Sequence, residues 1–183
     1  GADDEAGAYA TVSVLGYAVL GLVWLAVLPL VRDPLLDFLR VGGEARPGAD
    51  FAFTAGAVVF TLAGAANTTV YALQGYDRFD LGNAASLTVS FVQAAGLGLT
   101  LWQGWGLPGV VCATGAGWAA GALAGALLLR AGAPAFRWAS PRRAAGFVRA
   151  SLAYGAPLQL ANLLGVAHQQ VDKLLLARWV ALA

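Results

Sequence analysis

The chain of 183 residues contains no methionine, one histidine and one cysteine. A lone cysteine excludes a disulfide within the chain and a metal site built on several thiolates. Because Cys112 lies inside an apolar run, we expect it to be a small packing residue. Since position 1 is glycine and no methionine follows, we also expect the sequence to be an internal part of a longer chain.

Charge is scarce as well, at 11% of residues, whereas soluble domains carry charge on about 25%. Hydrophobic residues make up 59% of the chain and its mean hydropathy is +0.69. These values indicate an integral membrane protein whose solvent is the lipid bilayer. The sequence has no basic face interleaved with aromatic residues, so we do not expect a nucleic-acid partner. The acidic start, Asp3-Asp4-Glu5, is unlike the basic start of a secretory signal peptide, so the first apolar run predicts a span.

Five apolar runs reach the length of about 20 residues that crosses a hydrocarbon core of about 30 Å. Four of them predict spans at about 9–31, 51–73, 84–102 and 107–129, and the fifth lies within 151–183. The predicted fold class is therefore all-α, a polytopic transmembrane helix bundle. We divide the chain into residues 1–130, a linker at 131–150 and an opening helix at 151–183.

Polar segments separate these runs. Residues 32–50 predict a hydrophilic connection, in which Leu35 to Val41 form an amphipathic patch. The turn at 74–83 holds several charges, and Asp80 or Asn83 is expected to cap the next helix. The segment from Arg130 to Arg149 has five arginines, and we expect it to follow the membrane surface.

Two short patterns refine this outline. Ser140 followed by Pro141 is typical of an N-cap and a first helical residue. In the fourth run a small residue recurs at every fourth place, which favours close approach of a neighbouring helix: Gly109, Ala113, Gly117, Gly121 and Gly125.

Counts of Lys and Arg predict the orientation. The N-terminal segment, the 74–83 turn and the arginine-rich linker together carry six such residues, and the connections on the other side carry three. We therefore expect the N-terminus and the 130–150 linker to be cytoplasmic, in a multi-pass protein of the cytoplasmic membrane.

Polar residues within apolar runs are candidates for function. On the fifth helix, one face collects Gln159, Asn162, Gln169, Gln170 and Lys173, at about 100° per residue. His168 and Asp172, spaced i and i+4, share another side. They could form a packing hydrogen bond or an ion-coupling pair, because a carboxylate can move the imidazole pKa across physiological pH.

The second helix offers a smaller polar face, in which Asn67 and Gln74 are seven residues apart with Tyr71 between them. This face could be helix-helix contact or the lining of a cavity. A cavity would add Arg78 at its mouth, where a guanidinium could hold a phosphate group. The two acidic clusters, Asp3-Asp4-Glu5 and Asp77-x-x-Asp80, have no nearby histidine or cysteine to act as a base or nucleophile. We expect no catalytic residue, metal or cofactor.

Several short motifs, taken in order, are similar to those of a known family: Ala72-Leu-Gln-Gly-Tyr-Asp-Arg-Phe-Asp-Leu-Gly-Asn83, Gly104-Trp-Gly-Leu-Pro-Gly109, the arginine linker, Tyr154-Gly-Ala-Pro-Leu158 and Asp172. Together they resemble the polysaccharide-export flippases of the multidrug/oligosaccharidyl-lipid/polysaccharide superfamily, whose fold is called MATE-like. The resemblance implies twelve to fourteen helices in two bundles, of which the five runs would be the third to the seventh. Residues 1–130 would then end the N-terminal bundle, and residues 151–183 would open the C-terminal one.

The same resemblance implies a membrane transporter, not an enzyme, that moves undecaprenyl-pyrophosphate-linked oligosaccharide outward by alternating access. Its partners would include the polymerase and export proteins of polysaccharide biosynthesis. One alternative is a multidrug cation antiporter of the same superfamily, with His168 and Asp172 as the coupling pair. Another is a membrane-embedded glycan polymerase or ligase.

Overall fold

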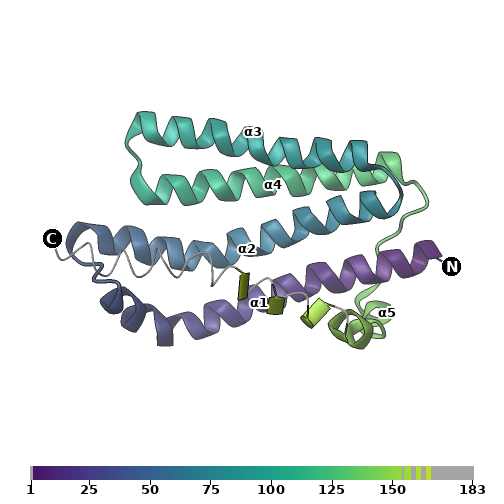
Figure 1. Ribbon diagram of the computed structural model, residues 1–183, viewed down its shortest axis with the longest axis horizontal. Helices are drawn as coiled ribbons and strands as arrows, with labels where there is room; N and C mark the ends of the chain where they lie inside the picture. Colours follow the sequence, from purple (N-terminus) through teal and green to yellow (C-terminus); the bar gives the residue numbers. More distant parts are fainter. Residues whose placement is uncertain (1, 154, 158–159, 162–163, 166–183) are drawn as a thin grey trace.

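The computed structural model describes residues 2–153, 155–157, 160–161 and 164–165 (Figure 1). Within these residues every element is helical, which confirms the all-α class. The elements are, in order, α1 (Ala2–Phe38), the 3-10 turn η1 (Gly43–Ala45), α2 (Arg46–Gly75), α3 (Phe79–Gln103), α4 (Gly106–Gly132) and α5 (Pro141–Ala145).

Four of these helices, α1 to α4, are long and apolar enough to cross a membrane. Their most apolar windows are only 11 to 22% buried within the chain, and large side chains such as Leu30 and Leu101 are 75% and 78% exposed. In water such surfaces would be strongly unfavourable, so their solvent is lipid. The predicted spans at 9–31, 51–73, 84–102 and 107–129 lie within these four helices, and the fifth predicted helix lies largely outside the described residues.

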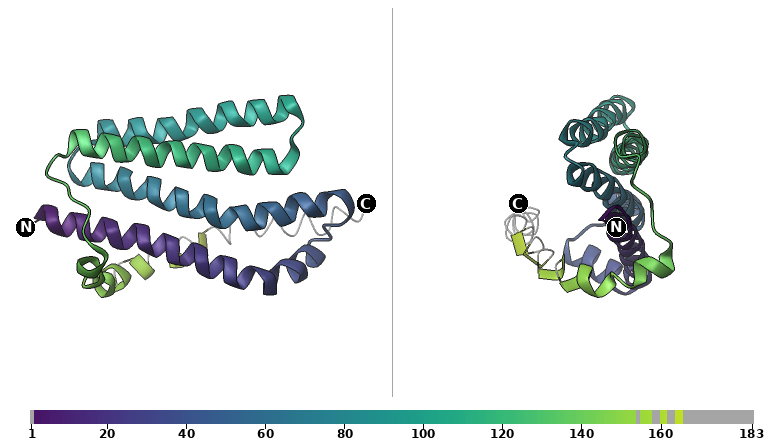
Figure 2. Two further views of the ribbon diagram at one scale, coloured as in Figure 1. Left: turned by 180° about the vertical axis from the view of Figure 1, so that it is seen from behind. Right: turned by 90° about the vertical axis from the view of Figure 1, so that its right-hand side faces the viewer.

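The four long helices form one curved layer in the order α1, α2, α4, α3 (Figure 2). α2 packs against α1 on one side and α4 on the other, while α3 packs along α4 and touches α2. One end of the layer, the turn end, holds the connections at 39–45 and 104–105; the opposite end, the linker end, holds the N-terminus, the turn at 76–78 and residues 133–147 (Figure 1).

The small residues of α4 let its neighbours come close. Gly109, Ala113, Gly117, Gly121 and Gly125 are all buried. A Cβ on Gly117 would overlap the Gln93 side chain of α3, and one on Gly125 would overlap Thr69 of α2. The predicted small-residue ridge is therefore confirmed, and it serves both neighbouring helices along one line.

The predicted connection at 32–50 is wrong, because α1 continues to Phe38 and α2 already begins at Arg46. α1 contains Pro29 and Pro34 and bends in its part nearest the turn end (Figure 1), as expected where proline removes a helical hydrogen bond. Most of the charges that suggested a loop lie on the two helices and are neutralised in pairs. Arg32 Nε lies 3.5 Å from Asp50 Oδ1, and Arg46 lies 2.8 Å from Asp37 and 3.3 Å from Asp33.

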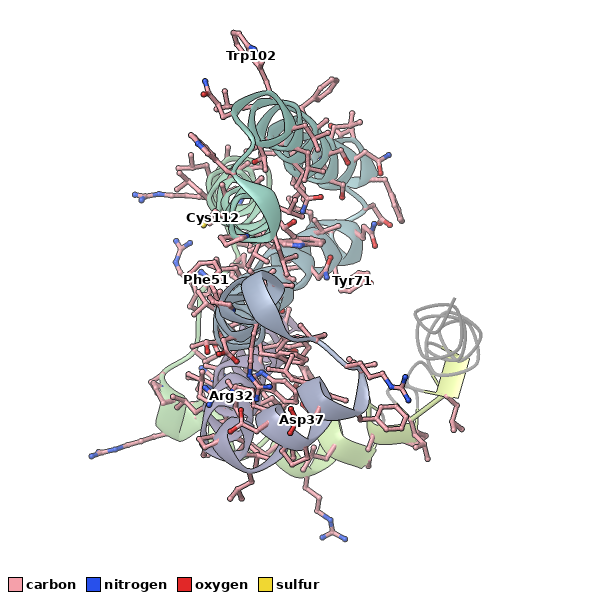
Figure 3. The ribbon with its side chains drawn as sticks, turned by 90° about the vertical axis from the view of Figure 1, so that its left-hand side faces the viewer. Arg32, Asp37, Phe51, Tyr71, Trp102 and Cys112 are labelled. Atoms are coloured by element: carbon pink, nitrogen blue, oxygen red, sulfur yellow. The ribbon has the colours of Figure 1, made fainter. Side chains whose placement is uncertain are left out.

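Of the two predicted helix N-caps, one is confirmed and one is wrong. The Ser140 cap is confirmed, since its hydroxyl accepts a hydrogen bond from the Arg143 amide at 3.4 Å. The capping of α3 by Asp80 or Asn83 is wrong, because the N-cap is Arg78 and no side chain caps the helix. Cys112 is exposed (Figure 3), which also corrects its expected packing role.

The linker after α4 docks on the first turns of α1, an arrangement that its arginine content did not predict. The Ala139 amide donates to Thr11 Oγ1 at 3.1 Å, and Phe147 contacts the ring of Tyr9 edge to face at 5.1 Å. Phe136, 7% exposed, completes an apolar cluster of residues from three long helices and the linker: Ala10, Leu73, Leu129 and Ala133. The linker thus packs on the N-terminal part of α1 at the linker end.

Candidate substrate-facing polar surface

One face of α2 is covered by neither of the helices beside it. The α4 side of α2 is marked by Ala66 and Thr69, which pack on the glycine ridge, and its α1 side by Thr61, which lies against Gly21. Between those two sides lies a third face with three of the predicted cavity residues: Asn67, Tyr71 and Gln74. Tyr71 is 67% exposed and points to the open side of the curved layer, away from Phe51 and Cys112 (Figure 3).

The carboxamides of Asn67 and Gln74 lack the hydrogen-bond partners within their own helix that nearby hydroxyl groups have. Thr68 and Ser86 donate to carbonyl groups one turn earlier, at 2.8 and 3.1 Å. Within the part of the chain that the structure describes, no hydrogen bond joins the side chain of Asn67 or Gln74 to another residue. A carboxamide in hydrocarbon costs several kcal/mol, of order 2–7, if it stays unbonded. This face therefore requires water, a substrate or another polar segment against it.

A second polar stripe, on α3, was missed in the sequence analysis. Asn83, Ser86, Ser90 and Gln93 follow one another at intervals of three, four and three residues, which places them on one helical face. This spacing is a signal that the sequence alone contains. Ser90 and Asn83 are exposed, and Gln93 Nε2 donates to the Thr114 carbonyl of α4 at 3.4 Å.

The two stripes meet at Gly82 of α3. A Cβ added to Gly82 would face Gln74 and Val70 of α2 and would lie 3.5 Å from Gln74 Cγ. From that contact the α3 stripe continues along the helix through Ser86 and Ser90, which are both exposed. We call the combined set the polar surface: Asn67, Tyr71, Gln74, Asn83, Ser86 and Ser90. It covers about the last third of α2 and the first half of α3, next to the linker end, and it contains hydroxyls and carboxamides without a charge.

Arg78 lies beside this surface with its guanidinium already occupied. Its Nε and Nη2 each lie 3.2 Å from an oxygen of Asp80, and Nη1 donates to the Gly132 carbonyl at 3.4 Å. The Asp80 carboxylate raises the pKa of Arg78 above its ordinary value. Arg78 thus ties the start of α3 to the end of α4, and a phosphate would have to displace Asp80 from the bidentate edge.

The acidic groups near the N-terminus are also engaged. Tyr76 Oη donates to Asp3 Oδ1 at 2.7 Å, and burial together with that carboxylate raises the pKa of Tyr76 to about 12. Asp4 pairs with Arg143 at 3.2 Å. Among the described residues, no group of three His, Cys, Asp or Glu is arranged to hold a metal ion.

The remaining predicted site residues lie outside the described part of the chain, so their predictions stay as they were made. They are Gln159, Asn162, His168, Gln169, Gln170, Asp172 and Lys173. The described part does place Asn67, Tyr71 and Gln74 together on one uncovered face, with Arg78 at its linker end.

Comparison with known proteins gives no relative from which a function could be transferred. No family model, no curated protein and no solved structure matches this chain.

Proposed function

We propose that this chain is part of a flippase that moves lipid-linked oligosaccharide across the cytoplasmic membrane by alternating access. In this proposal the polar surface of α2 and α3 lines a central cavity, and the polar face predicted for residues 151–183 lies across from it. The substrate would be an undecaprenyl-pyrophosphate-linked oligosaccharide, and the protein would work beside a polysaccharide polymerase and export proteins. The helices would belong to a larger MATE-like architecture.

The observation that carries the proposal is the set of unbonded carboxamides on an open face. Asn67 and Gln74 together offer donors and acceptors that the described chain leaves without partners, beside the hydroxyls of Ser86 and Ser90. A sugar ring presents alternating hydroxyl donors and acceptors, which such a surface can exchange for water. The surface itself carries no charge, and this composition suits a glycan better than a drug cation.

Orientation supports the direction of transport. Six arginines lie at the linker end, in the turn at 76–78 and in residues 130–149, against three at the turn end. By the excess of basic residues in cytoplasmic connections, the linker end faces the cytoplasm. The polar surface begins at that end, so a substrate from the cytoplasm would reach it first. For transport by alternating access, the affinity of the protein for this substrate must differ between the inward-facing and outward-facing states.

The test is a flipping assay with the full-length protein in proteoliposomes that contain a fluorescent lipid-linked oligosaccharide. A membrane-impermeant quencher measures the fraction of label that has crossed. We expect Asn67→Leu to lower the flipping rate about tenfold, because one hydrogen bond to the glycan is lost at about 1–1.5 kcal/mol. The matched pair on α3 is Ser90→Ala, which should slow flipping, and Thr88→Val, which should not. Both hydroxyls donate to a carbonyl of their own helix, but only Ser90 belongs to the polar surface.

Other outcomes would support other functions. Export of dyes with unchanged surface glycan would contradict the flippase and favour an antiporter, in which His168 and Asp172 couple the ion. Loss of glycan turnover on changing Asp3, Asp4, Asp77 and Asp80 to Asn, with transport intact, would favour a polymerase or ligase.

A further inference from the structure

The arginines of the linker differ in how their charge is used. Arg137 donates to the backbone carbonyls of Pro134 and Phe136, and Arg143 pairs with Asp4 at 3.2 Å. Arg130, Arg142 and Arg149 are exposed, and no ion pair or hydrogen bond joins their guanidinium groups to another described residue. Three unpaired guanidinium groups therefore face outward from this segment.

The linker contains no acidic residue that could neutralise them. Residues 130–149 include five arginines and no aspartate or glutamate. Two acidic residues of other elements at this end are already paired, Asp4 with Arg143 and Asp80 with Arg78. The three arginines all lie at the linker end of the layer, Arg130 in the last turn of α4, Arg142 in α5 and Arg149 after it, and we call them together the basic surface.

The position of this basic surface is that of the lipid headgroups. Arg130 lies in the last turn of α4, a membrane-spanning helix, and α5 packs beside the start of α1 (Figure 1). Trp138 is 48% exposed and Leu152 is 61% exposed. Tryptophan favours the boundary between headgroups and hydrocarbon, so these two side chains locate the linker at that boundary.

We propose that the basic surface binds the phosphate groups of anionic phospholipids. A guanidinium presents paired N–H donors that match phosphate oxygens, and clusters of basic residues directly after a spanning helix attract anionic lipid at about 1 kcal/mol per residue. The apolar side chains of Trp138 and Leu152 enter the same layer beside those headgroups. This site is separate from the polar surface and does not depend on the proposed transport.

The test compares two exposed arginines at opposite ends of the layer. The purified chain in mild detergent is incubated with equal amounts of phosphatidylglycerol and phosphatidylcholine, and retained lipids are counted by native mass spectrometry. We expect retention of phosphatidylglycerol over phosphatidylcholine, and a roughly fivefold lower ratio in Arg142→Gln, the equivalent of about 1 kcal/mol. Arg40→Gln, in the 39–45 connection at the turn end, is the control and should leave the ratio unchanged.

Arg142→Lys keeps the charge and should retain most of the preference, which separates lipid binding from loss of structure. An equal decrease in Arg142→Gln and Arg40→Gln would overturn the proposal, because the preference would then follow net charge alone. Displacement of phosphatidylglycerol by sodium phosphate, but not by sodium chloride of the same ionic strength, would also overturn it in favour of a free-anion site.

Discussion

The two ends of the helical layer differ in what holds them together. At the turn end, Arg32 and Arg46 are closed into pairs with the aspartates of α1 and α2, at 2.8 to 3.5 Å; Figure 3 labels Arg32 and Asp37 there. Even Asp50 Oδ1, which is buried without a hydrogen bond, lies within ion-pair distance of Arg32. At the linker end an apolar cluster holds the chain together. Arg78 and Arg143 are paired with aspartates there, whereas Arg130, Arg142 and Arg149 have no partner among the residues that the structure describes.

The difference follows from how far apart in the chain the contacting residues are. Charges at the turn end pair between residues 1 to 18 positions apart, such as Arg32 with Asp33 and Asp50. The linker end joins Thr11 to Ala139, 128 positions apart. Bringing together residues that are close in the chain costs little conformational entropy, so charge pairing is enough to hold them. Bringing together residues that are far apart costs more entropy, which burial of apolar area must offset. The linker end should therefore be the more sensitive end to substitution.

Phe136→Ala should have the largest effect, because it empties the centre of the apolar cluster. Truncating a buried Phe costs about 3–5 kcal/mol, so the linker should detach and trypsin should cleave after Arg137 and Arg142 far faster. Phe51→Ala at the turn end, where the ring is 41% exposed, is the control and should leave the cleavage rate nearly unchanged. Equal rates in the two variants would contradict the proposed difference between the ends.

Gly7→Ala should come second. A Cβ at Gly7 would overlap the carbonyl of Arg137, and overpacking of this kind costs about 1–3 kcal/mol. Gly16→Ala adds the same methyl group to the same helix with nothing within 4 Å, so it should stabilise α1 slightly. Thermal unfolding in detergent measures both, and a lower midpoint for Gly16→Ala than for Gly7→Ala would refute the close contact.

Tyr76→Phe should have a smaller effect, about 1 kcal/mol for one hydrogen bond. Because the pKa of Tyr76 is raised to about 12, its contribution is fully present below the ordinary tyrosine pKa of about 10. That contribution is lost as pH rises through about 12, where a phenolate would repel Asp3. Absorbance titration at 295 nm should show one late-titrating tyrosine, which Tyr76→Phe removes.

Arg46→Gln should have the smallest effect, since its ion pairs with Asp33 and Asp37 are exposed and such pairs contribute little. The expected change is a slight decrease of the unfolding midpoint that disappears at high salt. A decrease larger than that of Tyr76→Phe, or one that salt does not alter, would show that charge pairing does more at the turn end than the contact distances imply.

Much of the fold could be predicted because lipid makes local sequence decisive. Apolar length alone located α1 to α4, and the fourfold spacing of Gly117 and its neighbours identified the packing line of α4. The prediction of a loop at 32–50 was wrong because a loop and two charged helix ends have the same composition. The pairing of Arg46 with Asp37, nine positions away, is what distinguishes the helix ends from a loop.

The candidate site was predicted less completely, for a different reason. Asn67, Tyr71 and Gln74 share a face by spacing alone, so their grouping could be read from the sequence. Their alignment with Ser86 and Ser90 depends on the contact of Gly82 with Gln74, and the docking of the linker depends on Thr11 and Ala139. Contacts between distant positions leave no periodic signal in a single sequence.

The glycine ridge of α4 has a mechanical consequence. Helices that touch backbone to side chain along five small residues have little space in which to slide, so α2, α3 and α4 should move as one rigid body. α1 bends in the half that contains Pro29 and Pro34. If the layer opens and closes, the hinge therefore belongs in α1, and the rigid unit of α2, α3 and α4 is the arm that swings.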